Sequence, residues 1–528
     1  MFKILISDQL SEEGISILKS HTEFQVDVRT GLSESALVEA IGEYDGLLIR
    51  SATTVTKKII DAGKKLKVIG RAGVGIDNVD VEAATNRGIV VMNTPEANTM
   101  STAEHAFSML LSLARSIPQA NASVKSGKWE RSKFLGVELF QKTLGIIGLG
   151  RIGSEVAKRA QSFNMHVMAY DPFISKEKAQ MLNIEVASLD DIYAKADFIT
   201  LHTPLVKETE NLLNAEAFAK IKKGIRIINC ARGGLIDEAA LCEALDKGIV
   251  AGVALDVFSK EPPIDSPLLK YPQVIMTPHL GASTKEAQEN VSVDVAKQIV
   301  EVLKSGLIIN SINAPSFNAE SLKILNPYLQ LGNKLGLLLV QLIADPLKEI
   351  RITYDGDFES IDVRPITLSI LKGILQYVLQ GEIITIVNAS MIAEKRGIKY
   401  SETKINHPGF SNSIHIEAVT VHDSSSVEGV IRLPNKEQRI VRINGFTLDA
   451  PPEGNLLIMS NKDVPGVIGH VATKLGEYKI NIAGMTVGRE CIGGKAVTII
   501  YVDSAISKDV LDKLADKDEI WDLKMVKL

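Results

Sequence analysis

Apolar runs and amphipathic segments alternate along the first 97 residues of the chain. The apolar runs have the length of buried strands and occupy 3–7, 46–49, 67–69 and 89–92. Between them, segments such as 11–19 and 34–41 place apolar residues three or four positions apart, which is the spacing of an amphipathic helix. Strands that alternate with helices predict a parallel sheet covered by helices. Residues 1–97 are therefore expected to form a doubly wound α/β unit.

A second alternation of the same kind follows. The apolar runs expected as strands are 144–147, 166–170, 198–202, 226–229, 252–255 and 274–276. They are enough for a six-stranded parallel sheet. The apolar segment 99–116 predicts a long helix that joins the two units, and 284–305 predicts a helix that returns the chain to the first unit. We therefore expect one domain formed by 1–97 with 283–315, and a second formed by 98–282.

The pattern changes beyond residue 315. Residues 316–452 mix helix and strand patterns without a recognisable catalytic motif, which predicts an α+β intervening domain that ends at the turn-rich segment 449–454. Residues 453–528 alternate as strand, helix, strand, strand, helix and strand, the order of a ferredoxin-like domain. The fold class expected for the chain is thus α/β, with two doubly wound parallel-sheet domains followed by an α+β domain and a ferredoxin-like domain.

Composition narrows the classes of partner. The 528 residues are enough for about three or four domains. Lys and Arg (59) nearly balance Asp and Glu (64), and no long basic run suggests binding to nucleic acid or to a membrane surface. Lys3 and Asp8 interrupt the first apolar run, so it is expected to be a strand and not a signal peptide. Three unevenly spaced cysteines argue against a disulfide framework and favour a reducing cytoplasm. No metal site is predicted.

The sequence GLGRIG follows the first apolar run of the second unit. Gly148 allows a tight turn, Gly150 lets the backbone approach a pyrophosphate, and Gly153 lets the next helix pack on the strand. Asp171 ends the following strand, where a carboxylate accepts hydrogen bonds from a ribose 2′-hydroxyl and repels a 2′-phosphate. Glycines that serve only a packed turn are the alternative. The strand, turn, helix and acidic residue together favour a dinucleotide site selective for NAD over NADP.

Three later segments end strands with polar or charged residues, at the edge where a cofactor crevice is expected. They are IINCARGG (227–234), VALDVFSKEPP (253–263) and VIMTPHLGAS (274–283). Oxidation of an alcohol beside a carboxylate needs a cation, a base and a group that orients the base. Arg232, His279 and Glu261 have these three properties. Each residue alone would more often be structural or solvated, so their joint placement is the evidence.

These motifs resemble the D-isomer-specific 2-hydroxyacid dehydrogenases over about 45–313. The matching sequences are GRAGVGIDNVD (70–80), GLGRIG (148–153), NCARGGLIDE (229–238), ALDVFSKEPP (254–263) and TPHLGAST (277–284). With two further domains, the chain is similar to long members of the family, which carry an intervening domain and an ACT domain. The resemblance implies Rossmann-like domains, NAD as the cofactor, and a catalytic group formed by Arg232, Glu261 and His279.

The resemblance also implies contacts to cofactor and substrate. The implied cofactor contacts are Gly148, Gly150, Arg151, Ile152, Gly153, Asp171, Thr203, Cys230, Ala231, Asp256, Gly281 and Ala282. The implied substrate contacts are Arg50, Arg71, Gly73, Val74, Gly75 and Arg131. For Cys230, a small packed residue beside the nicotinamide is favoured over a redox group, because nothing nearby suggests a low thiol pKa.

Phosphate and effector recognition rest on less specific signals. Arg50 and Arg131 match residues that meet a substrate phosphate in the family, Arg131 from the second chain of a dimer, although solvated arginines are the alternative for both. In the ACT-like tail, Asn461, Asp463 and Asn481 occupy positions that bind L-serine in some members. Some of those members have histidine in place of Asn461, and the loop could also be only a turn.

The resemblance implies one activity and leaves two alternatives. The implied activity is NAD-dependent oxidation of 3-phospho-D-glycerate to 3-phosphohydroxypyruvate, the first step of L-serine biosynthesis, with feedback by L-serine, in a homo-oligomer (a dimer or tetramer). The first alternative is a non-catalytic, NAD-sensing interaction protein, since some corepressors keep the same three residues. The second is another 2-hydroxyacid dehydrogenase, such as a hydroxypyruvate or glyoxylate reductase, for which residues 316–528 would have no evident purpose.

Overall fold

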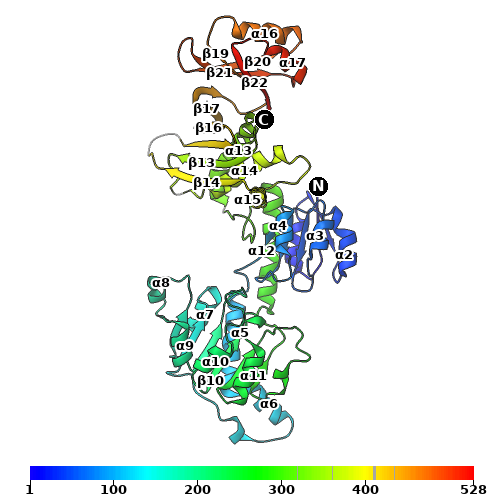
Figure 1. Cartoon of the computed structure of the whole chain (residues 1–528). Coiled ribbons are helices and arrows are strands. Elements are labelled where there is room, and N and C mark those ends of the chain that lie inside the picture. The colour runs from blue at the N-terminus through cyan, green and yellow to red at the C-terminus, as the bar shows by residue number, and fades with distance from the viewer. Residues whose placement is uncertain (318, 360, 408–411, 433) are drawn as a thin grey trace.

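The computed structural model describes residues 1–317, 319–359, 361–407, 412–432 and 434–528. The chain is elongated, with four units in a row (Figure 1). The unit built from the second alternation lies at one end, the first unit and the intervening unit follow, and the C-terminal unit lies at the other end. Among the described residues, no helix is long and apolar enough to cross a membrane.

The first unit is a five-stranded parallel sheet with the order β2-β1-β3-β4-β5. Its strands are β1 (Phe2–Ile6), β2 (Phe24–Val28), β3 (Gly46–Ile49), β4 (Val68–Arg71) and β5 (Val90–Met92). Its helices are α1 (Glu12–Lys19), α2 (Glu34–Ala40), η1 (Ile41–Glu43), α3 (Lys57–Ala62) and α4 (Val81–Asn86). The sequence patterns did not predict β2, an edge strand that is only partly buried.

The helix α12 (Lys285–Ser305) returns the chain to the first unit, as predicted. It begins at Thr284, whose hydroxyl accepts a hydrogen bond from the Ala287 N–H, and it ends at Gly306 in the left-handed conformation. A Cβ on Gly14 of α1 would lie 2.7 Å from the Ser292 carbonyl oxygen of α12, so glycine permits the close crossing of these helices. Both helices cover the same face of the first sheet.

The second unit is a seven-stranded parallel sheet with the order β12-β11-β10-β9-β6-β7-β8. Its strands are β6 (Thr143–Ile147), β7 (His166–Tyr170), β8 (Glu185–Val186), β9 (Phe198–Leu201), β10 (Ile225–Asn229), β11 (Val250–Leu255) and β12 (Val274–Met276). The prediction of six strands is wrong by one. β8 pairs with β7 at the sheet edge, and its two exposed residues are too few and too polar to form an apolar run.

Helices cover both faces of the second sheet. They are α5 (Thr99–Arg115), α6 (Ile117–Lys125), η2 (Arg131–Phe134), α7 (Arg151–Ser162), α8 (Lys176–Met181), α9 (Leu189–Lys195), α10 (Ala215–Lys220), η3 (Gly233–Leu235), α11 (Glu238–Asp246) and η4 (Pro267–Lys270). The buried side chains of α5 and α7 share one apolar cluster with the sheet, and those of α9, α10 and α11 share another. The helix predicted at 99–116 is thus part of this unit's own core.

The intervening unit is a six-stranded mixed sheet with the order β14-β13-β15-β16-β17-β18. Its strands are β13 (Leu347–Asp355), β14 (Lys399–Ile405), β15 (Ser413–Thr420), β16 (Ser424–Arg432), β17 (Glu437–Ile443) and β18 (Phe446–Ala450). Its helices are α13 (Ala319–Leu342), α14 (Arg364–Val378) and α15 (Ala389–Lys395). One apolar cluster runs from the first unit through this unit into the last, and the second unit has no residue in it among those described.

The C-terminal unit is a four-stranded antiparallel sheet with the order β20-β21-β19-β22. Its elements are β19 (Asn455–Lys462), α16 (Val467–Glu477), β20 (Ile482–Arg489), β21 (Lys495–Val502), α17 (Lys508–Leu514) and β22 (Ile520–Lys527). This is the ferredoxin-like arrangement, with the first and third strands in the centre of the sheet. The predicted fold class is therefore confirmed.

Candidate active site

The carboxyl ends of β10, β11 and β12 lie side by side in the second sheet. Asn229, Leu255 and Met276 are paired across these three strands, so the residues that follow them emerge at the same edge. In a parallel sheet of this kind, ligands bind beyond the carboxyl ends of the strands. The topology therefore brings together the three segments that the sequence singled out.

His279 and Glu261 form a close pair at this edge. The His279 Nδ1 lies 2.8 Å from the Glu261 Oε2. The second carboxylate oxygen of Glu261 accepts a hydrogen bond from the Phe258 N–H at 3.1 Å. Because a carboxylate only accepts, Nδ1 carries the proton and Nε2 is left for proton exchange with a substrate. The side chain of His279 is about half exposed (52%), as a group that reacts with a substrate must be.

Backbone contacts fix the loop that carries Arg232. The Asn229 side-chain amide donates to the Arg232 carbonyl oxygen at 2.7 Å. A Cβ on Gly233 would lie 2.0 Å from the Phe258 carbonyl oxygen, so only glycine lets this loop pack against the segment that leads to Glu261. The positions of Arg232 and Glu261 are thus mutually determined by backbone packing.

The guanidinium of Arg232 reaches the first unit. Its Nε donates to the Asp77 carboxylate at 3.0 Å. A Cβ on Gly75 would lie 2.0 Å from the Arg232 Nη2, so the glycine makes room for the guanidinium. Arg232 therefore lies between the two doubly wound units, against the loop that the sequence assigned to the substrate.

Two further arginines surround the same loop. The Arg71 Nε donates to the Asn78 side-chain oxygen at 3.0 Å, and the Asn78 amide donates to the Arg50 carbonyl oxygen at 2.6 Å. Burial lowers the pKa of Arg71 to about 10, the charge of Arg232 is the next cause, and Arg50 contributes in the same direction. Arg71 is still a cation at neutral pH. The Arg71 guanidinium is therefore close enough to Arg232 and Arg50 to be repelled by both, and an anionic ligand would relieve this repulsion.

The loop 71–75 is held from behind by the end of β5. The Gly73 N–H donates to the Thr94 hydroxyl at 2.9 Å, and the Asn93 amide donates to the Val74 carbonyl oxygen at 2.6 Å. Within the described chain, the Val74 and Gly75 N–H groups have no hydrogen-bond acceptor. They are available to an anion, which fits the substrate contacts that the resemblance implies for this loop.

The GLGRIG turn has the form that a dinucleotide site requires. Gly148 has a φ of +96°, and a Cβ on Gly153 would lie 2.1 Å from the Gly148 carbonyl oxygen. In contrast, a Cβ on Gly150 would have open space around it, which leaves room for a pyrophosphate at the N-terminus of α7. The Asp171 carboxylate accepts from the Leu149 N–H at 2.8 Å, so it lies beside this turn.

Other residues assigned to the cofactor line the same crevice. The buried Thr203 hydroxyl has no hydrogen-bond partner among the described residues, and a cofactor would supply one. Arg151 begins α7, where its Nη2 is 3.2 Å from a carboxylate oxygen of Glu96. The thiol of Cys230 is buried, and burial, followed by the nearby Asp256 charge, raises its pKa. A protonated, buried thiol fits the packed residue favoured for this position.

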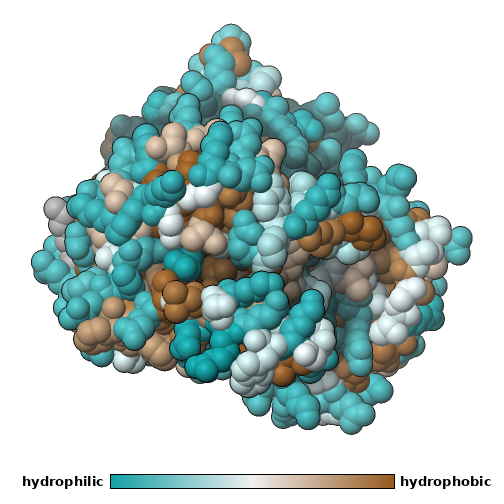
Figure 2. Space-filling model, turned by 90° about the horizontal axis from the view of Figure 1, so that it is seen from below, coloured by the Kyte–Doolittle hydropathy of each residue, from teal (hydrophilic) through white to brown (hydrophobic). Residues whose placement is uncertain are grey.

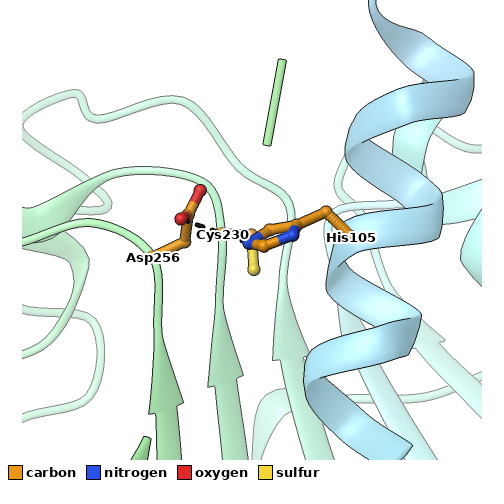
Figure 3. A group of neighbouring side chains, drawn as sticks. All are labelled: His105, Cys230 and Asp256. Atoms are coloured by element: carbon orange, nitrogen blue, oxygen red, sulfur yellow. Dashed lines mark ion pairs between the residues drawn. The ribbon is translucent and has the colours of Figure 1, made fainter. Parts of the chain in front are cut away.

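Sequence reasoning missed two histidines near the crevice. His105 of α5 lies 3.2 Å from the Asp256 carboxylate (Figure 3). His202 follows β9, and burial lowers its pKa to about 4, so it is neutral at physiological pH. Its Nε2 lies 2.9 Å from the Thr200 hydroxyl. His105 could have been noticed in the sequence, because it is a polar residue among the apolar positions of the predicted helix 99–116.

One chain does not bring Arg131 to the arginine group. Arg131 is exposed at the start of η2, in the segment after α6. Figure 1 shows α6 at the end of the molecule that is farthest from the intervening unit. The predicted contact of Arg131 with a substrate therefore needs a second chain.

The three effector residues do not meet within one chain either. The Asn461 amide is buried and contacts the Thr498 hydroxyl and the Lys462 carbonyl oxygen. Asp463 follows the end of β19 and accepts from Arg489 at 3.3 Å. Asn481 precedes β20 at the opposite end of the sheet and donates to Asp503 at 2.8 Å. Ile482, the residue after Asn481, is level with Asn455 in the sheet, because both pair with Val502. Asn461 lies six residues further along β19, which corresponds to about 20 Å at about 3.4 Å per residue.

Comparison with known proteins agrees with this architecture. The NAD binding domain of D-isomer specific 2-hydroxyacid dehydrogenases matches residues 107–281, the D-3-phosphoglycerate dehydrogenase intervening domain matches 324–444, and the ACT domain matches 455–518. The chain is 45% identical to the D-3-phosphoglycerate dehydrogenase of Synechocystis sp., over all of this chain and 95% of that protein. It is 43% identical to that of Bacillus subtilis over the full length of both. The chain belongs to the D-3-phosphoglycerate dehydrogenase family.

A solved structure extends the likeness to the first two units. The D-lactate dehydrogenase of Aquifex aeolicus, complexed with NAD and lactic acid, is 28% identical and superposes with a TM-score of 0.54. The match covers 59% of this chain and all of that one. The predicted enzyme class, an oxidoreductase with an NAD-binding domain and an ACT domain, is thus confirmed.

Proposed function

We propose that the chain oxidises 3-phospho-D-glycerate to 3-phosphohydroxypyruvate with NAD, the first step of L-serine biosynthesis. The observation that carries this proposal is that Arg232, from the sheet edge that also holds the His279–Glu261 pair, reaches the loop of the first unit that Arg71 and Arg50 flank. The substrate has a carboxylate and a phosphate, with a combined charge of about −2.5 to −3 at neutral pH. Three cations match that charge, whereas a simple hydroxy acid has only its carboxylate.

The residues divide the chemistry among them. Arg232 holds the carboxylate and polarises the oxygen that becomes a carbonyl, because its guanidinium can donate two parallel hydrogen bonds. His279 Nε2 removes the hydroxyl proton, and Glu261 stabilises the imidazolium that results. The glycine turn and Asp171 would hold NAD, which would supply the acceptor for the hydride of the carbinol carbon. The N–H groups of Val74 and Gly75 orient the anionic end of the substrate.

The cofactor preference follows from Asp171. Its carboxylate lies beside the glycine turn, where the adenosine ribose of a dinucleotide sits in this fold. A negative charge there accepts hydrogen bonds from the 2′-hydroxyl of NAD and repels the 2′-phosphate of NADP. The proposal is therefore NAD over NADP.

A second copy of the chain is part of the proposed site. The segment around Arg131 exposes large apolar side chains, among them Trp129 (78% exposed) and Leu135 (91% exposed). Figure 2 views the molecule from this end and shows apolar patches among hydrophilic residues. Such exposed groups favour contact with another protein surface. We propose a homodimer in which Arg131 meets the substrate phosphate bound by the partner chain, and further pairing of ACT domains would give a tetramer.

Pairing of two ACT domains would also complete an effector site. Asp463 and Asn481 lie at opposite ends of the sheet in one chain, so antiparallel pairing places the Asp463 of one copy near the Asn481 of the other. A carboxylate and an amide can bind the ammonium and carboxylate groups of an amino acid. We propose L-serine as that effector. Asn461 is buried and already paired, so its contribution is to shape the loop.

We propose four domains with the boundaries expected from the sequence pattern. They are 1–97 with 283–315 for substrate, 98–282 for NAD, 316–452 for the intervening domain and 453–528 for the ACT domain. The three family matches fall inside the last three of these limits.

Two other functions share parts of this site. A hydroxypyruvate or glyoxylate reductase needs the same catalytic group but neither Arg50 nor the two C-terminal domains. An NAD-sensing interaction protein needs no turnover at all. NADH formation with a panel of 2-hydroxy acids, with and without L-serine, separates the three. We expect the highest kcat/KM with 3-phospho-D-glycerate and a decrease with L-serine; a preference for an unphosphorylated acid, or no turnover, would contradict the proposal.

A further inference from the structure

The helix α5 places a histidine against the loop that carries His279. His105 is mostly buried (19% exposed), and its Nε2 lies 3.2 Å from the Asp256 Oδ1 and 3.2 Å from the Thr277 hydroxyl oxygen. The Thr277 hydroxyl itself donates to the Asp256 Oδ1 at 2.6 Å. Because the Thr277 hydroxyl proton is donated to Asp256, the Thr277 oxygen can only accept from His105. The His105 N–H can therefore donate to the Thr277 oxygen and to the Asp256 Oδ1.

Asp256 organises the whole turn from 277 to 281. Its Oδ1 also accepts from the Leu280 N–H at 2.7 Å, and its Oδ2 accepts from the Gly281 N–H at 2.8 Å. Its backbone carbonyl oxygen accepts from the His279 N–H at 3.0 Å. His279 has a φ of +55°, a conformation that costs a non-glycine residue about 1 to 3 kcal/mol unless its surroundings impose it. The four hydrogen bonds from this turn to Asp256 impose it.

The Asp256 carboxylate depends on its donors because it is almost fully buried (1% exposed). Burial raises its pKa, but hydrogen bonds from His105, Thr277 and the Leu280 N–H more than compensate, so the net direction is downward. An ionised carboxylate in this place loses much of its stabilisation when one donor is removed. His105 is the donor that comes from outside the turn, because it belongs to α5, which packs against β10 and β11.

Cys230 is the third polar group of this cluster (Figure 3). The three donor atoms lie within 4.8 Å of one another, a set that could suit a metal ion. The carboxylate oxygens, however, already accept hydrogen bonds from the turn, and burial keeps the thiol protonated by raising its pKa. The contacts therefore favour a hydrogen-bonding role for His105 over a metal-binding one.

We propose that His105 is a positioning residue for the catalytic histidine. By donating to Asp256 and Thr277, it fixes the carboxylate that holds the turn, and so keeps His279 in the orientation that meets Glu261. This inference rests on the proposed role of His279 as the acid and base. His105 touches neither substrate nor the reacting atoms, so its effect appears in kcat and much less in KM for 3-phospho-D-glycerate.

Two substitutions separate donation from packing. His105→Leu keeps an apolar side chain on α5 and removes the donor, and we expect kcat to fall about 10- to 100-fold, the range for losing a hydrogen bond to a buried charge. KM for 3-phospho-D-glycerate should change less than about threefold, because His105 does not contact the substrate and its loss should leave substrate binding nearly unchanged. His105→Gln retains an N–H donor of similar reach, and we expect it to restore kcat to within about threefold of the parent. Leu110→Met, at another buried position of α5, is the packing control and should resemble the parent.

The outcomes distinguish this inference from the proposed function. A His105→Leu enzyme with unchanged kcat, or His105→Leu and His105→Gln enzymes with equal losses, would overturn the positioning role. Thermal unfolding of each variant verifies that the chain is folded, and the glutamine variant keeps the test valid if the leucine variant unfolds. Activity that survives in His279→Asn would instead contradict the catalytic assignment itself.

Discussion

The catalytic crevice and the regulatory end of the molecule differ in how complete they are within one chain. In the crevice, three adjacent strands deliver Arg232, Glu261 and His279 to one edge, and His279 lies 2.8 Å from Glu261. In the ACT domain, Asp463 and Asn481 lie at opposite ends of the sheet. A parallel sheet gathers the carboxyl ends of all its strands at one edge. In the ACT domain β19 and β20 run in the same direction, but Asp463 follows the carboxyl end of β19 and Asn481 precedes the amino end of β20. Glu261 and His279 therefore meet within one chain, whereas the proposed contacts of Arg131 with the substrate and of the effector with two ACT domains need a second copy.

The largest expected effect is in the catalytic crevice. His279→Asn removes the group that exchanges the proton, so we expect kcat to fall by about 100-fold or more. NAD should still bind, because the glycine turn and Asp171 are untouched. Stopped-flow and steady-state kinetics measure the first effect, and calorimetry with NAD provides the control. A kcat within threefold of the parent would remove His279 from the mechanism.

Arg50→Ala tests whether the arginine group recognises a phosphate. Loss of a charge-assisted contact of about 1.5 to 3 kcal/mol should lower kcat/KM for 3-phospho-D-glycerate about 10- to 100-fold. The values for a short unphosphorylated 2-hydroxy acid should stay close to those of the parent. Arg29→Ala, at an exposed position of the same domain, is the matched control. Equal losses for both substrates would make Arg50 a structural residue.

Replacing Asp171 tests the cofactor preference. Asp171→Ser with Pro172→Arg removes the carboxylate and adds a cation, so discrimination between NAD and NADP should shift toward NADP by about 1 to 3 kcal/mol. Because Asp171 also accepts from the Leu149 N–H, affinity for NAD should fall as well. The ratio of kcat/KM values for the two cofactors measures the shift. An unchanged ratio would mean that the ribose binds elsewhere.

Asn481→Ala tests the proposed effector site between two ACT domains and should have the smallest effect on catalysis. If L-serine is bound between two ACT domains, this variant loses inhibition while its uninhibited kcat and KM remain near those of the parent. Coupling of this kind is typically about 1 to 3 kcal/mol, or 5- to 150-fold in affinity. Calorimetry with L-serine on the parent and the variant is the measurement. Equal binding by both would exclude Asn481, and no binding to the parent would exclude L-serine as the effector.

The sequence predicted most of the crevice because its residues follow strands that are apolar and buried. The ends of 226–229, 252–255 and 274–276 could be recognised one by one, and parallel topology then required them to meet. The roles of Arg232, Glu261 and His279 stay proposals, but their proximity was foreseen. The exposed edge strands β2 and β8 were missed, since an edge strand needs few apolar residues.

Contacts between distant segments could not be foreseen from the sequence. His105 belongs to a helix whose apolar spacing predicts burial, and nothing in that spacing indicates Asp256 as its partner. In the same way, the sequence does not show at which end of the ACT sheet Asp463 and Asn481 lie. The register of β19, β20 and β21 places them at opposite ends within one chain. Pairings of this kind depend on strand direction and register, which local patterns do not specify.

A mixture of two inactive variants tests the central claim most directly. Arg131→Ala chains keep the catalytic group but lose the proposed phosphate contact in the partner's site, and His279→Asn chains keep Arg131 but lose the base. After the two are unfolded and refolded together, each mixed dimer has one site with His279 from one chain and Arg131 from the other. Random pairing should restore about one quarter of the parent activity on 3-phospho-D-glycerate. Activity no greater than the mean of the two separate variants would contradict the account.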